Sequence, residues 1–124
     1  MAIIAPTITY PPASRGNGSC VLAVWTPVTE NDTCSPVSFP EFSDKSVHVS
    51  GTFGGASVAV NGSNNSGASY VALNDPSSTA IAITTEKIKA VLENTVRIQP
   101  AATGGSGQSL TISMLFHVAN PLRA

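Results

Sequence analysis

The sequence predicts an all-β domain: an antiparallel β-sandwich, jelly-roll-like or immunoglobulin-like, with one short helix and an extended N-terminal arm. Short segments of alternating apolar and polar residues recur along the chain, separated by runs of Gly, Pro, Asn and Ser. Ser, Thr, Asn and Gly, which favour turns and strand faces over helices, supply most of the polarity. The 124 residues are enough for one domain with a substantial core.

The first 19 residues have the composition of an arm, and residues 20–124 form the predicted sandwich. Three prolines in the arm fix the backbone and remove hydrogen-bond donors. Four apolar or aromatic side chains accompany them, and we expect these to lie on a partner. They are Ile3, Ile4, Ile8 and Tyr10. The alternative is a first strand of the chain's own sandwich, followed by a proline-rich loop.

Alternation is clearest in the last predicted strand, where every second residue is apolar. These residues are Leu110, Ile112, Met114, Phe116 and Val118. Ser46–Phe53 alternates in the same way, with Val47 and Val49 on one face and His48 on the other. Cys20–Pro27, which contains the single tryptophan, Trp25, has the composition of a buried strand.

The middle of the chain contains further short strands. Ala56–Val60 is predicted to pair with Tyr70–Leu73 as a hairpin across the polar loop Asn61–Gly67. The run Gly104–Gly107 is predicted to form a second hairpin between its flanking strands. Glu86–Leu92 instead has apolar residues spaced as in a helix of about two turns.

The chain lacks a recognisable catalytic constellation. His48 and His117, the two histidines, occupy the polar faces of predicted strands, and most acidic residues lie beside turns. The loop Ser63–Gly67 contains no carboxylate, which makes it a poor calcium ligand set. We therefore expect no catalytic residue, no metal site, no cofactor and no enzymatic activity.

Charge and hydropathy exclude two classes of partner. Only 10% of residues are charged, the net charge is −1, and the six basic residues are scattered, so we expect no nucleic-acid binding. No apolar run approaches the roughly 20 residues of a membrane span. Cys20 and Cys34 flank one apolar segment, and both two buried thiols and a disulfide are compatible with their positions.

From Phe53 onward the sequence resembles a group of small virion proteins of tailed phages. The resemblance rests on the segments Phe53–Val58, Asn61–Tyr70, Val91–Asn94 and Val96–Arg97, and on Pro100, Gly104, Gly105 and Gly107. The chain has Asn65 where that group has an acidic residue, and Tyr70 where it has tryptophan.

The resemblance implies a structural component of a bacteriophage virion, a capsid decoration or cement protein. Its partners would be the major capsid protein and further copies of the chain, on the outer capsid surface of virions assembled in the host cytoplasm. A carbohydrate-binding or host-adhesion module of a phage tail or fibre is the alternative. An accessory domain of an enzyme also fits the size.

Overall fold

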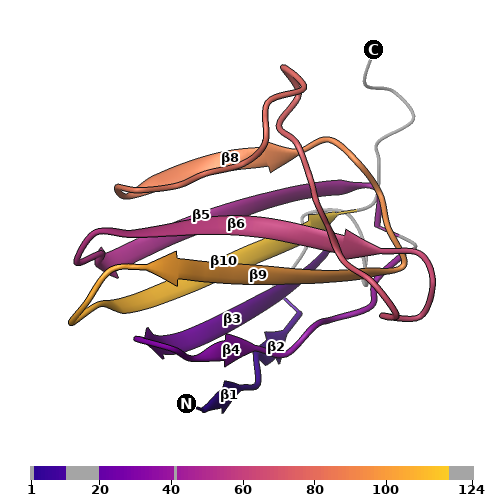
Figure 1. Cartoon of the computed structure of the whole chain (residues 1–124). Helices are drawn as coiled ribbons and strands as arrows, with labels where there is room; N and C mark the ends of the chain where they lie inside the picture. The colour runs from indigo at the N-terminus through magenta and orange to yellow at the C-terminus, as the bar shows by residue number, and fades with distance from the viewer. Residues whose placement is uncertain (1, 11–19, 41, 118–124) are drawn as a thin grey trace.

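The computed structural model describes residues 2–10, 20–40 and 42–117 (Figure 1). Residues 11–19, the second half of the predicted arm, and Val118 lie outside the described residues. The described residues form ten strands and no helix. The strands are β1 (Ile3–Ile4), β2 (Thr7–Thr9), β3 (Cys20–Thr29), β4 (Thr33–Cys34), β5 (Asp44–Thr52), β6 (Ala56–Ser63), β7 (Val71–Ala72), β8 (Lys87–Val91), β9 (Arg97–Gly104) and β10 (Ser109–His117).

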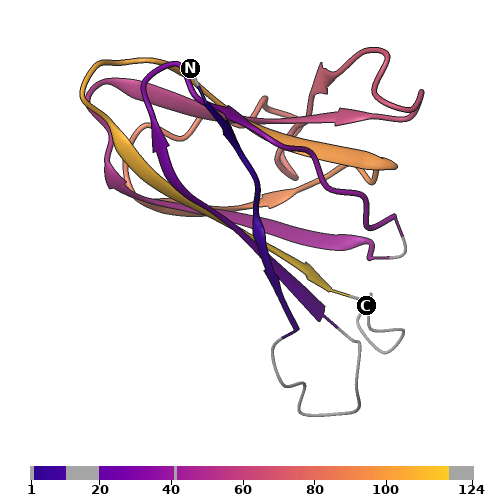
Figure 2. The same cartoon turned by 90° about the horizontal axis from the view of Figure 1, so that it is seen from below.

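Two layers of sheet face each other, as the sequence predicts (Figure 2). The first layer is an antiparallel five-stranded sheet with the order β2-β3-β10-β5-β8. The second layer is an antiparallel three-stranded sheet with the order β7-β6-β9. The predicted all-β sandwich is therefore confirmed.

A two-stranded parallel sheet of β1 and β4 widens the second layer. Just after β4, Val37 forms an antiparallel bridge with Ile98 of β9. The Gln99 side chain donates a hydrogen bond from Nε2 to the carbonyl oxygen of Cys34 at 2.6 Å. The order across this layer is thus β7, β6, β9, β4 and β1, which places β1 and β7 on opposite sides.

Strand β10 runs through the centre of the five-stranded sheet and supplies the middle of the core. Its inward residues are at most 1% exposed: Leu110, Ile112, Met114 and Phe116. Neighbouring β5 buries Val47 and Val49 on the same face, while His48 stays half-exposed on the outer face. The alternation predicted for both strands is confirmed.

Strand β3 departs from strict alternation at a bulge opposite β10. Trp25 pairs with Ile112 and Val28 pairs with Leu110, so β3 contains one more residue than β10 between these two pairs. Thr26 and Pro27 are exposed between the two buried side chains. A bulge tolerates proline because the ladder of hydrogen bonds is already interrupted there.

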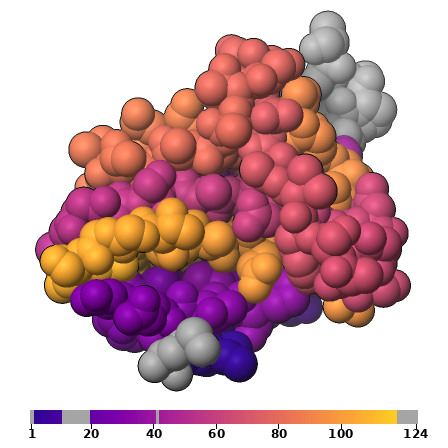
Figure 3. Space-filling model, in the orientation of Figure 1, coloured from indigo at the N-terminus to yellow at the C-terminus, as the bar shows by residue number. Residues whose placement is uncertain are grey.

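Strands β6 and β7 form the predicted hairpin. Asn61 pairs with Ala72 and Gly62 pairs with Val71. The polar loop that joins the strands projects at one end of the molecule, at the lower right of the space-filling view (Figure 3). The loop therefore joins two neighbouring strands of the second layer at this end of the molecule.

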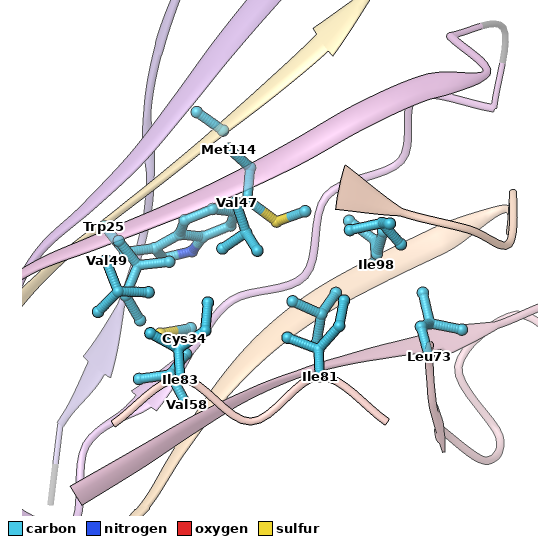
Figure 4. Packing of buried hydrophobic residues seen from close by; sticks show 14 of the residues in the cluster. Trp25, Cys34, Val47, Val49, Val58, Leu73, Ile81, Ile83, Ile98 and Met114 are labelled. Atoms are coloured by element: carbon cyan, nitrogen blue, oxygen red, sulfur yellow. The ribbon is translucent and has the colours of Figure 1, made fainter. Parts of the chain in front are cut away.

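The core lies between the layers, with Trp25, Val47, Val49 and Met114 facing the second layer (Figure 4). The opposing side chains come from β4, β6, β9 and the segments after β7: Cys34, Val58, Leu73, Ile81, Ile83 and Ile98. Trp25 is fully buried, and its indole N–H donates to the carbonyl oxygen of Ser35 at 2.9 Å. A buried indole needs such an acceptor, so this bond joins the two layers at a fixed point.

The helix predicted for Glu86–Leu92 is wrong, because this segment contains the edge strand β8. It pairs antiparallel with β5, with Lys45 opposite Val91. Only Val91 reaches the core, whereas Ile88 is 64% and Leu92 is 49% exposed. Three apolar residues are a weak helix signal, and pairing with the edge of β5 overrides it.

The hairpin predicted at Gly104–Gly107 is also wrong. The run connects β9 in one layer to β10 in the other, and these strands do not pair. Gly54, on the neighbouring connection from β5 to β6, has φ of 58° and accepts a hydrogen bond from the Ser106 amide at 3.0 Å. A Cβ on Gly54 would overlap the Ser106 carbonyl oxygen, so the two crossings pack closely only with glycine here.

Replacing Met114 by Ala should lower the free energy of unfolding by about 2–5 kcal/mol, because the side chain is fully buried between the layers. Its neighbour Leu115 has a similar size but points outward and is 38% exposed. Leu115→Ala should therefore cost about 1 kcal/mol or less. Urea unfolding of both variants tests the assignment of faces, and equal losses would contradict it.

Candidate functional site

The described part of the predicted arm lies along one side of the sandwich and joins both layers. Strand β1 runs parallel to β4 in the second layer, and β2 runs antiparallel to β3 in the first. The amides of Thr33 and Ser35 donate to the carbonyl oxygens of Ala2 and Ile4, at 2.8 and 2.9 Å. We call residues 2–10 the arm edge, since they form an edge of the chain's own sandwich.

The four predicted docking residues divide into two pairs. Ile4 and Ile8 are half-buried and pack against the core of their own domain. Ile3 and Tyr10 are 74% and 68% exposed. The expectation that all four side chains lie on a partner is therefore corrected for Ile4 and Ile8, because alternation along β1 and β2 turns them inward. Ile3 and Tyr10 remain available for contact.

Asp32, in the turn between β3 and β4, anchors the start of the arm edge. Its Oδ1 accepts a hydrogen bond from the Ala2 amide at 3.1 Å. Its Oδ2 accepts bonds from the Thr29 amide at 2.9 Å and the Thr29 hydroxyl at 2.6 Å. These bonds, the hydroxyl bond foremost, lower the pKa of Asp32. The sequence alone indicates only an aspartate in a turn, because Ala2, the residue that Asp32 holds in the arm edge, lies 30 residues away.

Both strands of the arm edge are terminal strands within the described residues. Strand β2 ends the five-stranded sheet and β1 ends the parallel pair. A terminal strand has backbone groups on its outer side that a strand of another chain can pair with. The arm edge thus combines an open sheet margin with two exposed apolar side chains.

Neither of the two histidines is buried. His48 lies on the outer sheet face, as predicted, with Nε2 3.1 Å from the Glu86 carboxylate, and both side chains are well exposed. His117 is half-exposed at the end of β10. Within ranges 2–10, 20–40 and 42–117, three or more His, Cys, Asp or Glu side chains never gather as metal ligands do.

The two cysteines lie in different surroundings, and Cys34 is a free thiol. Cys34 is 2% exposed, and burial, with a smaller contribution from the charge of Asp32, raises the pKa of its thiol to about 12. Cys20 is half-buried at the start of β3. A thiol with so high a pKa is almost entirely protonated at neutral pH and is a poor nucleophile.

Lys45 is the other buried ionisable group near a sheet end. It is 6% exposed on the inner face of β5, and burial lowers the pKa of its ammonium group. Nζ donates to the Asn94 side-chain oxygen at 2.9 Å and to the Ser43 carbonyl oxygen at 3.4 Å. These partners link β5 to the connection before β9, which indicates a structural role. The described residues also contain no helix long and apolar enough to cross a membrane.

Comparison with known proteins identifies a shared fold. The sequence matches no protein-family profile and no curated protein. The chain is similar in structure to the SPBc2 prophage-derived protein YomS, whose crystal structure superposes with a TM-score of 0.58. The match covers 77% of this chain and 93% of that one, at 10% sequence identity. At this identity the likeness establishes the fold alone.

Replacing Asp32 by Ala should loosen the arm edge while leaving the core folded. We expect severalfold faster hydrogen exchange at the amides of Thr33 and Ser35, which donate to the arm. Asp75→Ala is the matched control, because Asp75 also caps a turn, accepting from the amides of Ser77 and Thr79. Equal exchange in both variants would show that Asp32 does not anchor the arm.

Acid should weaken the same anchor. The pKa of Asp32 in the folded protein lies below its ordinary value of 3.8, so the carboxylate stabilises the fold above that pH. This stabilisation is lost as pH falls through the lowered pKa of the folded state. Melting temperatures measured from about pH 6 to about pH 3 should therefore fall less steeply for Asp32→Asn than for the wild type. Parallel curves would contradict the linkage.

Proposed function

We propose that this protein is a non-enzymatic structural component of a phage virion, a decoration protein that binds the outer capsid surface through its arm edge. The observation that carries the proposal is the exposure of Ile3 and Tyr10 on an open margin of both sheets. Exposed apolar side chains beside strands whose outer side has no partner strand are typical of a surface that another protein covers.

Two further observations support a phage origin. The sequence resembles small virion proteins of tailed phages from Phe53 onward. The structural neighbour YomS is described as derived from a prophage, and it shares the fold over most of both chains. Together with the arm edge, these observations favour the virion over an enzyme accessory domain.

The proposed mechanism is stabilisation of the shell by binding its assembled form. The partners are the major capsid protein and other copies of this chain. A protein that binds the assembled shell more tightly than free subunits shifts the equilibrium toward assembly. The surface suits a permanent contact, because only 10% of the residues are charged and few charges must lose their water.

A double variant, Ile3→Ser with Tyr10→Ser, should lose at least tenfold in affinity for capsids of the phage that encodes the chain. Fully burying one large apolar side chain contributes roughly 1.5–3 kcal/mol, and about 1.4 kcal/mol corresponds to a factor of ten. Cosedimentation of the purified variant with assembled capsids measures the loss. Sedimentation equilibrium of the variant alone measures any loss of self-association.

Ile88→Ser is the matched control, since Ile88 is 64% exposed but lies on β8, at the opposite side of the five-stranded sheet. Capsid binding should be unchanged in this variant. All variants should keep the wild-type melting temperature, because the changed side chains are mostly exposed. Wild-type capsid binding by the double variant would contradict the proposed docking edge.

A further inference from the structure

A second surface feature lies on the other side of the molecule, away from the arm edge. It is a cleft of about 770 Å³, lined by the loop after β6, by β7 and by the connection that precedes β9. Within the second layer, β7 is on the side opposite β1. The cleft therefore opens away from the proposed capsid contact, and neither Ile3 nor Tyr10 belongs to its lining.

Hydrogen bonds hold the loop wall of the cleft in one conformation. The buried Ser63 hydroxyl accepts from the Gly67 amide at 3.0 Å and donates to the Asn65 side-chain oxygen at 2.7 Å. The same Asn65 oxygen accepts from the Ser69 amide at 3.1 Å, and Asn65 Nδ2 donates to the Ser69 hydroxyl at 2.9 Å. The loop is thus closed on itself before any ligand arrives, which reduces the entropy lost on binding.

The opposite wall is held by Glu93 and Asn74. Glu93 accepts hydrogen bonds from the Asn74 amide at 2.8 Å and from Asn74 Nδ2 at 2.7 Å. The bond from the Asn74 amide is the main cause that lowers the pKa of Glu93, so the carboxylate is ionised at neutral pH. Asn64 connects the walls, because its side-chain oxygen accepts from the Val96 amide at 2.8 Å.

In the side-chain amides of Asn64 and Asn74, these bonds use only one of the two polar atoms. Asn64 Nδ2, a donor, and the Asn74 side-chain oxygen, an acceptor, have no hydrogen-bond partner among the described residues. The lining also includes Val71, which is 67% exposed, and Ala72. The cleft therefore offers a fixed donor, a fixed acceptor and a small apolar surface, all oriented by the fold.

Uncharged saccharides have the matching chemistry. Sugar hydroxyls both donate and accept, as amide side chains require, and the C–H faces of the ring can pack on Val71 and Ala72. The ionised Glu93 disfavours anionic ligands, because the residues that line the cleft include no Lys or Arg and the nearby Lys45 is buried. A single carboxylate is too few ligands for a divalent cation. An added peptide strand would find only the two residues of β7 to pair with.

We propose that this cleft is a binding site for an uncharged saccharide, with Asn64 as donor, Asn74 and Glu93 as acceptors, and Val71 as the apolar contact. The proposal is independent of capsid binding, since it concerns the isolated chain. If the chain also decorates capsids as proposed above, the position of the cleft directs the saccharide site outward from the particle.

Titration of the isolated protein with neutral trisaccharides tests the proposal. The probes are maltotriose, cellotriose, mannotriose and tri-N-acetylchitotriose, with anionic sialyllactose for comparison. At least one neutral probe should shift the backbone NMR signals of Asn64, Val71 and Asn74, and sialyllactose should bind more weakly. Absence of shifts at these residues with all four neutral probes would overturn the proposal.

Two variants localise the binding. Asn64→Asp keeps the oxygen that accepts from the Val96 amide but replaces the outward donor by a charged acceptor, and affinity should fall about tenfold. Val71→Glu places a charge on the exposed apolar surface without disturbing the core, and it should abolish binding even if Asn64→Asp distorts the loop.

Asn31→Asp is the matched control, because it makes the same change at an exposed turn on the arm side. It should bind the neutral probe like the wild type. Saccharide binding that survives both cleft variants would overturn the assignment. Capsid cosedimentation of Val71→Glu should remain at the wild-type level, so failure of one proposal is distinguishable from failure of the other.

Discussion

The hydrogen bond from the Trp25 indole to the Ser35 carbonyl oxygen connects the core to the surface that we assign to docking. Trp25 is fully buried, and its N–H would be left without a partner if the segment after β4 moved away. The Ser35 amide in turn donates to the Ile4 carbonyl oxygen. One residue, Ser35, thus transmits the rigidity of the core to the arm edge, and Asp32 secures the same edge from the other end of β4.

The sequence was sufficient to predict the layers but not their connections. Alternation of apolar and polar residues predicted β10 and β5, and apolar composition predicted the buried Trp25. Successive side chains of a strand point to opposite faces, so this pattern is visible in a short stretch of sequence. It could not reveal the crossing at Gly104–Gly107, since a glycine turn looks the same whether the next strand pairs with the previous one or joins the facing sheet. The edge strand β8 could not be predicted for a related reason. Its extended conformation depends on pairing with β5, about 40 residues away.

Prediction of the candidate site had the same limit: the local sequence shows which residues are apolar, but contacts between distant segments decide where their side chains point. Composition identified the apolar side chains of the arm, but it could not predict which of them point toward the core and which toward solvent. Parallel pairing of β1 with β4 and antiparallel pairing of β2 with β3 decide that Ile4 and Ile8 face inward. The cleft proposed to bind a saccharide is not indicated by the sequence, because its walls come from segments near residues 63, 74 and 93 that meet only in the fold.

The two outer margins of the five-stranded sheet differ in a way that bears on self-assembly. Strand β8 carries Lys87 and Lys89, two of the six basic residues of the chain, and Lys89 is paired with Asp75 across the adjacent turn. Charged side chains on an edge strand oppose continuous pairing of sheet edge with sheet edge. The margin at β2 has no such charge between Ala2 and Tyr10. Because only one of the two margins lacks charged side chains, continuous edge-to-edge pairing of copies into fibres is disfavoured.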